Sequence, residues 1–133
     1  MSLWTAEEIA AATSGKLVGK ATTAVEGVSI DTRTIVPDDL FIALRGPNHD
    51  AHDFAGKAVE AGASVLLVDR ELELPVAQVI VSDTTKALEA LGSARRNEIV
   101  GFVLGITGSV GKTGTKELAA AGFSALGKTH ATQ

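Results

Sequence analysis

Residues 99–116 read IVGFVLGITGSVGKTGTK, and this segment is the most informative part of the sequence. Its first part is a nearly continuous apolar run, made of Val100, Phe102, Val103, Leu104 and Ile106. Such a run is typical of a strand that is buried on both faces of a parallel sheet. The run breaks into a glycine turn that ends Gly-Lys-Thr and opens onto a helical pattern. A strand, a glycine turn and a helix in this order predict a loop that holds a polyphosphate.

The loop has the chemistry that phosphate binding requires. Gly108 and Gly111 permit backbone angles that side chains forbid, so successive N–H groups can turn toward an anion. A helix that begins near Lys112 adds its unsatisfied N–H groups and the positive end of its dipole. In phosphate-binding loops the lysine at this position reaches the β- and γ-phosphates, and the next hydroxyl, here that of Thr113, coordinates Mg²⁺.

The spacing differs from the general G-x-x-x-x-G-K-[ST] pattern, because the position five before Gly111 is Ile106 rather than glycine. The alternative is a glycine-rich turn with an incidental surface lysine. We favour the phosphate loop, since the preceding apolar run and the following helical pattern are the context that the motif requires.

The composition limits the possible partners. The 133 residues carry a net charge of −4 and a pI near 5.3, which argues against general attraction to nucleic acid or to an anionic membrane. Cysteine is absent, so disulfides and thiolate metal sites are excluded. Glu7 and Glu8 stand where a signal peptide needs basic and then apolar residues, and no apolar run approaches the length of a membrane span. We therefore expect a cytoplasmic protein with no nucleic-acid partner and no membrane insertion.

Capping residues indicate where the first helix begins. Thr5 and Glu8 form a capping box, and Trp4 and Ile9 are placed as the hydrophobic staple around it. Gly15 is expected to end this helix.

The remaining elements of the first hundred residues alternate between strands and helices. A helix over residues 53–61 is expected to stop at Gly62, and Asp83 caps a second helix that ends around residues 95–97. Apolar runs and turn residues predict short strands at 16–18, 25–30, 40–44, 64–68 and 76–81.

This order of elements predicts an α/β protein with a domain boundary near Glu98. Residues 1–97 make a small α/β domain, and residues 98–133 make the first strand, P-loop and helix of a nucleotide-binding domain. Nucleotide-binding sheets of this type contain several parallel strands, so we expect the second domain to be incomplete.

Three stretches carry a resemblance to the Mur ligase family. Residues 29–33, SIDTR, resemble the family's D-[ST]-R turn. Residues 39–46, DLFIALRG, and 50–54, DAHDF, resemble its DLFxALxG…DxHDF segment. Residues 107–113, TGSVGKT, resemble its TG-x-x-GKT loop, and the TKE of residues 115–117 resembles the continuation of that loop in one member. The resemblance covers essentially the whole chain in a consistent order.

The resemblance implies a substrate site in the first domain and an ATP site in the second. The family's N-terminal domain binds the uridine diphosphate end of a UDP-linked muramoyl peptide, and its central domain binds ATP with Mg²⁺. The expected contacts to the UDP end are Thr32, Arg33, Asn48 and His49. The expected contacts to ATP are Thr107, Gly108, Ser109, Val110, Gly111, Lys112 and Thr113, with Thr113 on the metal.

The side chains suit these roles, because arginine can donate two hydrogen bonds to phosphate oxygens and asparagine can hydrogen-bond to the edge of a base. The plainer alternatives are that Arg33 is a solvated turn residue and that His52 bonds locally at a helix start. His49 and His52 lie three residues apart, but without a third ligand at a matching spacing they make a poor metal site.

The implied activity is that of an ATP-dependent amide ligase. ATP phosphorylates the terminal carboxylate of the UDP-linked muramoyl tripeptide, and the amine of D-alanyl-D-alanine attacks the acyl phosphate. Lys112 is the expected catalytic residue, since it neutralises charge on the transferring phosphoryl group. Much of the family's machinery is expected downstream of Gln133, so we expect this chain alone to be inactive.

Two other readings stay open. One is the sibling family member that adds the third amino acid, although the Ser109-Val110 pair and the TKE sequence at 115–117 favour the member that adds the dipeptide. The other is a non-catalytic module that only binds UDP-sugars or nucleotides. Because the second domain is expected to lack its neighbouring strands, we also expect copies of the chain to associate through residues 100–126.

Overall fold

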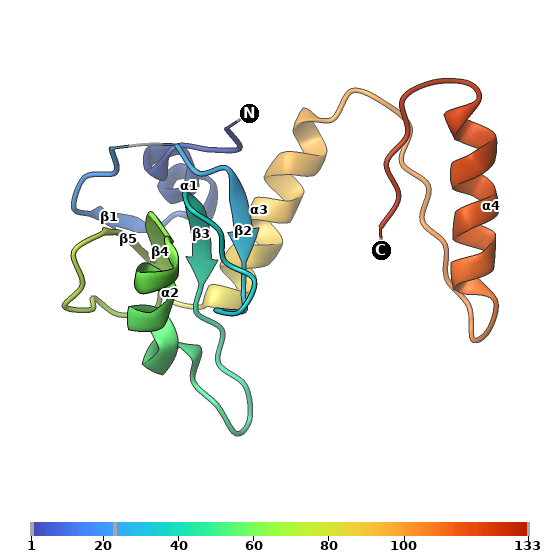
Figure 1. Ribbon diagram of the computed structural model, residues 1–133. Coiled ribbons are helices and arrows are strands. Elements are labelled where there is room, and N and C mark those ends of the chain that lie inside the picture. The colour runs from blue at the N-terminus through green and yellow to red at the C-terminus, as the bar shows by residue number, and fades with distance from the viewer. Residues whose placement is uncertain (1, 23, 133) are drawn as a thin grey trace. The chain divides into compact units, whose positions relative to one another are not determined.

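The computed structural model describes residues 2–22 and 24–132, which form two compact units, 1–99 and 100–133. Figure 1 labels the helices and strands of both units. Each unit is described by itself below.

The first unit is built on a five-stranded sheet in the order β1-β5-β4-β3-β2. The strands are β1 (Lys16–Val18), β2 (Gly27–Ser29), β3 (Asp39–Ile42), β4 (Val65–Val68) and β5 (Ala77–Ile80). Strands β2 to β5 run parallel to their neighbours, and β1 pairs antiparallel with β5 at one edge. The carboxyl ends of the four parallel strands therefore meet at one side of the sheet, where open α/β sheets bind their ligands.

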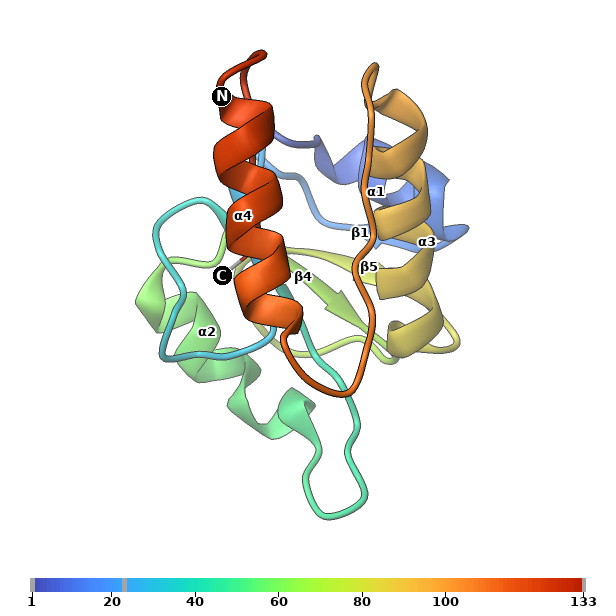
Figure 2. The ribbon, with the colours of Figure 1, turned by 90° about the vertical axis from the view of Figure 1, so that its right-hand side faces the viewer.

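Helices cover both faces of this sheet (Figure 2). Helix α1 (Ala6–Thr13) packs against α3 (Thr84–Glu98) on one face, and the short helix η1 (Ala51–Phe54) and α2 (Ala55–Ala61) lie on the other. Strands β3 and β4 are buried at every position, because they contribute alternate side chains to the two apolar clusters on the two faces. The predicted α/β class is confirmed by this layered arrangement.

Three of the predicted helix ends have the local chemistry expected of them. The Thr5 and Glu8 capping box is present, and Asp83 accepts hydrogen bonds from the backbone N–H groups of Thr85 and Lys86. Gly62 ends α2 in the left-handed conformation, as predicted. The prediction for α1 is wrong in detail, since the helix ends at Thr13 and its left-handed residue is Ser14, with φ 55°.

The strands of the first unit are found where they were predicted, but most are shorter. Strand β2 covers three residues of the predicted 25–30, and Val25 instead forms an isolated bridge with Trp4. The predicted helix over residues 53–61 is divided into η1 and α2, because Asp50 caps the chain earlier by accepting from the backbone N–H of His52.

The second unit corrects one prediction. Its helix α4 (Lys112–Ser124) is present, but residues 100–106 form no strand, and Val100, Phe102, Val103 and Leu104 are exposed. A strand needs a neighbour for its backbone hydrogen bonds, and none of residues 100–132 supplies one. The apolar run instead touches α4 through Phe102, whose ring centre lies 6.0 Å from that of Phe123.

None of the helices in the described part of the chain is both long and apolar enough to cross a membrane.

Candidate functional site

A cleft of about 600 Å³ opens at the carboxyl ends of β2 and β3. Its volume lies within the range of small-molecule sites. One wall comes from the turn after β2, and the other from the loop after β3 and the start of η1. The lining residues are Ile30, Asp31, Thr32, Arg33, Phe41, Leu44, Gly46, His49, Ala51 and Phe54.

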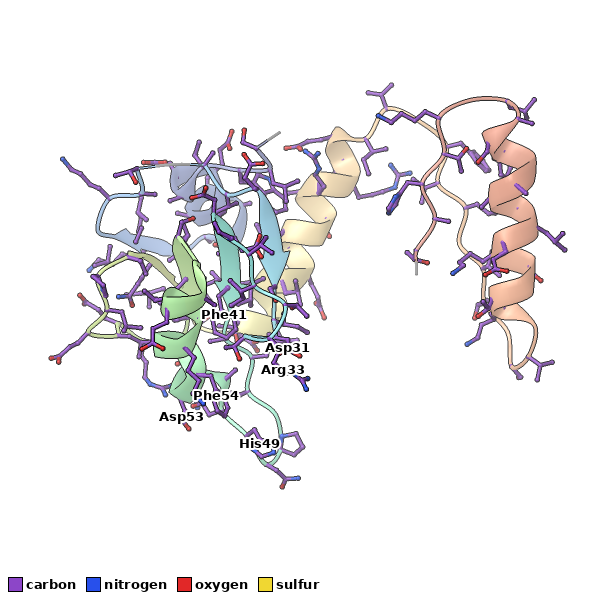
Figure 3. The ribbon with its side chains drawn as sticks, in the orientation of Figure 1. Asp31, Arg33, Phe41, His49, Asp53 and Phe54 are labelled. Carbon is purple, nitrogen blue, oxygen red and sulfur yellow. The ribbon has the colours of Figure 1, made fainter. Side chains whose placement is uncertain are left out.

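The cleft combines an apolar floor with a charged rim. Phe41 is buried, whereas Ile30 and Phe54 present exposed apolar surface. Figure 3 shows the labelled side chains of Asp31, Arg33, Phe41 and Phe54 near the end of β3, with His49 farther out on the loop that follows. The Lys57 amino group lies 5.6 Å from the centre of the Phe54 ring, so a cation also stands beside this wall. Such a cleft can hold a flat ring on its floor and an anion at its rim.

The turn after β2 is fixed by its own hydrogen bonds. The Ser29 hydroxyl accepts from the backbone N–H of Asp31 at 3.1 Å and lies 2.8 Å from the hydroxyl of Thr34. The Asp31 carboxylate accepts from the backbone N–H of Arg33 at 2.9 Å. This Asx-type turn explains why polar residues follow β2, and it holds Thr32 and Arg33 at the mouth of the cleft.

Asp31 also binds the Arg33 guanidinium. Arg33 Nε lies 3.0 Å from Asp31 Oδ1, and Nη2 lies 2.6 Å from Oδ2. These bonds and the positive charge lower the pKa of Asp31 from its ordinary 3.8 to about 2, and they raise the pKa of Arg33. The carboxylate orients the guanidinium, while Nη1 takes no part in these bonds.

The opposite wall is a short loop that is closed at its base. The Gly46 N–H donates to the His49 carbonyl at 2.7 Å, and the Ala51 N–H donates to the Leu44 carbonyl at 3.0 Å. Arg45 and Asp50 form an isolated bridge between these two bonds. The loop therefore leaves the sheet and returns to it within a few residues.

Three of the four residues predicted to contact a UDP group line this cleft: Thr32, Arg33 and His49. The fourth, Asn48, is exposed on the same loop and does not line it. Sequence reasoning missed the apolar floor, especially Phe41, Leu44 and Phe54. Their signal was their position at the end of a buried strand and in the loop and short helix that follow, where ligand sites of parallel sheets gather.

The predicted phosphate loop lies in the second unit. Gly111 has φ 74°, a left-handed conformation that favours glycine, and α4 begins at the next residue, Lys112. No side chain caps the first turn of α4, so its N–H groups point outward without a side-chain acceptor. Lys112 and Thr113 are exposed beside them. An amino group, a hydroxyl and uncapped backbone N–H groups are the donors and ligands that a polyphosphate with its metal ion requires, so the residues at this turn fit such a group.

Within residues 2–22 and 24–132, no three histidine, cysteine, aspartate or glutamate side chains are grouped so that they could hold a metal ion.

Sequence comparison identifies the relatives of this chain. The model of the Mur ligase family, catalytic domain, matches residues 24–100. The chain is 43% identical over 116 residues to UDP-N-acetylmuramoyl-tripeptide--D-alanyl-D-alanine ligase of Escherichia coli strain K12, which covers 87% of this chain and 25% of that protein. It is 32% identical over 106 residues to UDP-N-acetylmuramoyl-L-alanyl-D-glutamate--2,6-diaminopimelate ligase of Bacillus velezensis, which covers 78% of this chain and 22% of that protein.

Structural comparison gives the same family. The D-alanyl-D-alanyl ligase of Acinetobacter baumannii matches with a TM-score of 0.84 and 36% identity over 92% of this chain and 28% of that one. MurF ligase from Thermotoga maritima, solved in complex with ADP, matches with a TM-score of 0.57 and 29% identity over 68% of this chain and 21% of that one. The chain thus spans about a quarter of the length of the relatives it matches. Because the family model covers more than half of its residues and the fold agrees, the chain belongs to the Mur ligase family.

Proposed function

We propose that this chain is part of an ATP-dependent ligase that joins D-alanyl-D-alanine to a UDP-linked muramoyl tripeptide in peptidoglycan precursor synthesis. The observation that carries the proposal is the cleft at the ends of β2 and β3, lined by the predicted contacts Thr32, Arg33 and His49. The relatives that carry this activity in their names support it, at 43% identity against 32% for the ligase that adds diaminopimelate. The site of action we propose is the cytoplasm.

The cleft suits the uridine diphosphate end of the substrate. The exposed apolar surface of Ile30 and Phe54, with the buried Phe41 beneath, offers a place for the uracil ring to stack. Arg33 stands at the rim with Nη1 free of its bonds to Asp31, so it can bind the diphosphate. Thr32 adds a hydroxyl that donates or accepts.

Residues 107–113 are the proposed ATP site of a second domain, residues 98–133, separate from the substrate domain of residues 1–97. When bound, ATP supplies the phosphoryl group that activates the peptide carboxylate for attack by the dipeptide amine. Lys112 would neutralise phosphate charge as the catalytic residue, the N–H groups of the loop would hold phosphate oxygens, and Thr113 would hold Mg²⁺. The relative solved with ADP supports nucleotide binding in this family.

We infer further that copies of the chain associate through residues 100–126. Eight large apolar side chains of this segment are exposed: Val100, Phe102, Val103, Leu104, Val110, Leu118, Phe123 and Leu126. Covering them with a second copy removes apolar surface from water, which is the main driving force of association.

Calorimetric titration of the 133-residue chain with UDP and with Mg-ADP tests the division into two sites. Arg33→Ala should weaken UDP binding by roughly tenfold or more, because a hydrogen bond to a charged group is worth about 1.5–3 kcal/mol. Lys112→Ala should weaken the binding of Mg-ADP by a similar factor. Each variant is the control for the other, since Arg33→Ala should leave Mg-ADP binding unchanged and Lys112→Ala should leave UDP binding unchanged. Equal losses for both nucleotides in one variant would contradict two separate sites.

A further inference from the structure

Behind the wall of the cleft lies a fully buried histidine. His52 stands on η1 between two residues of the cleft lining, Ala51 and Phe54, and its side chain is 0% exposed. Both ring nitrogens are engaged. Nδ1 lies 2.5 Å from Asp50 Oδ1, and Nε2 lies 2.9 Å from the backbone nitrogen of Asp69, directly after β4.

These two contacts assign the proton on the ring. A backbone N–H can only donate, so Nε2 of His52 accepts the bond from Asp69 and carries no hydrogen. The single proton of the neutral imidazole then sits on Nδ1 and is donated to the Asp50 carboxylate. Asp69 Oδ1 also lies near Nε2, but its 3.2 Å distance is longer than the 2.9 Å contact to the backbone N–H.

Two arginines hold the carboxylates that surround this ring. Arg70 reaches Asp50 Oδ2 at 3.1 Å and Asp69 Oδ1 at 2.9 Å, and Arg45 reaches Asp69 Oδ2 at 2.7 Å. Two negative and two positive side chains thus balance around a neutral imidazole. The backbone N–H of His52 and the Arg70 guanidinium help to hold the pKa of Asp50 far below its ordinary value, so this carboxylate stays an acceptor.

The network joins the cleft wall to the sheet. Five lining residues belong to the segment that leaves β3 and returns through η1: Leu44, Gly46, His49, Ala51 and Phe54. Within the segment, His52 bonds to Asp50, which bridges to Arg45 at the base of the loop. Outside it, His52 bonds to Asp69 at the end of the neighbouring strand. The imidazole is therefore the buried link between this wall and β4.

We propose that His52 is a positioning residue of the nucleotide cleft, in which the neutral Nδ1–H imidazole fixes residues 44–54 against the end of β4. This inference rests on the proposed binding of the UDP group. His52 touches no bound group itself. It acts through the loop that carries His49 and through the ring of Phe54.

The test compares His52→Leu with a matched buried variant, Gln78→Leu. Gln78 is also a buried polar clamp, since its side-chain amide accepts from the Leu72 N–H at 2.8 Å and donates to the Leu72 carbonyl at 2.6 Å. It does not line the cleft. UDP affinity of the 133-residue chain is measured by calorimetry under conditions in which both variants are folded by circular dichroism.

We expect His52→Leu to weaken UDP binding by roughly tenfold, because it removes the imidazole bond to Asp50 and leaves the Asp69 N–H without its acceptor. Gln78→Leu should keep the affinity within about twofold. His52→Asn, whose amide can still donate to Asp50, should restore part of the loss. Wild-type affinity in His52→Leu, or equal losses in the two Leu variants, would overturn the inference while leaving the proposed function intact.

A second readout needs neither a stable variant nor UDP binding. Nitrogen NMR of the histidine rings in the wild-type chain should show His52 as the neutral Nδ1–H tautomer at pH 7. The opposite tautomer or an imidazolium would contradict the inference. Failure of the wild-type chain to bind UDP would instead refute the proposed function, and the ring spectrum would still decide the state of His52.

Discussion

Gly15 lies between the end of α1 and strand β5. Ser14, the residue before it, takes the left-handed conformation that ends α1. A Cβ atom at Gly15 would come within 2.6 Å of Val79 Cγ1 and 3.1 Å of the Ile80 carbonyl. The close approach of β5 therefore leaves no room for a side chain at this position.

Gly15→Ala should therefore destabilise the chain by about 1–3 kcal/mol, the usual result of overpacking a filled core. Gly92→Ala is the matched control, since Gly92 lies within α3 and a Cβ there meets nothing within 4 Å. That change should stabilise the chain by up to about 1 kcal/mol through helix propensity. Urea unfolding of the three proteins measures both effects, and a neutral Gly15→Ala would show that the packing is looser than described.

The pairing of Asp31 with Arg33 predicts an acid titration. The pKa of Asp31 is about 2, below its ordinary 3.8, so the pairing contributes fully above pH 3.8 and is lost as the pH falls through 2. Carbon NMR of the Asp31 carboxyl should give this midpoint. In Arg33→Ala the pKa should rise toward 3.8, whereas Arg70→Ala, which removes a partner of Asp50 and Asp69, should leave it unchanged. An unchanged pKa in Arg33→Ala would rule out the guanidinium as the cause.

At the scale of elements, the sequence predicted what depends on near neighbours. Capping residues located α1 and α3, and apolar runs located β3, β4 and β5. The same reasoning failed for residues 100–106, because an apolar run becomes a strand only when another strand pairs with it. The residues of the cleft were predicted only in part, because motifs locate neighbours in the sequence and not contacts between distant segments. Thr32, Arg33 and His49 follow from motifs, but the contact from His52 to Asp69 joins residues far apart in sequence.

The exposed apolar side chains of the second unit predict concentration-dependent association. Sedimentation of the 133-residue chain should show a mass above that of the monomer at high concentration, and Phe102→Asp with Leu118→Asp should lower it. Val36→Asp changes an exposed apolar residue of the first unit and serves as the control. A monomer at all concentrations would contradict the proposed association.

The small share of its relatives that this chain covers leads us to expect no ligase activity from the chain alone. The chain spans about a quarter of them, so most groups that hold the dipeptide amine and the remaining metal ligands are expected elsewhere. We predict that this chain alone releases no ADP in a D-alanyl-D-alanine-dependent manner when ATP, Mg²⁺ and the UDP-linked tripeptide are all present. A coupled ADP assay measures this, and dipeptide-dependent release above the enzyme-free blank would show that the chain is sufficient.

We propose above that the cleft after β2 and β3 receives a uridine nucleotide. Amide NMR of the 133-residue chain, titrated with UDP and in parallel with Mg-ADP, locates the residues that each nucleotide contacts. UDP should shift the amides of residues 30–33 and 44–54, while Mg-ADP should shift those of residues 107–113. Shifts from UDP that fall outside the cleft, or no shifts at saturating UDP, would show that the cleft is not a uridine nucleotide site.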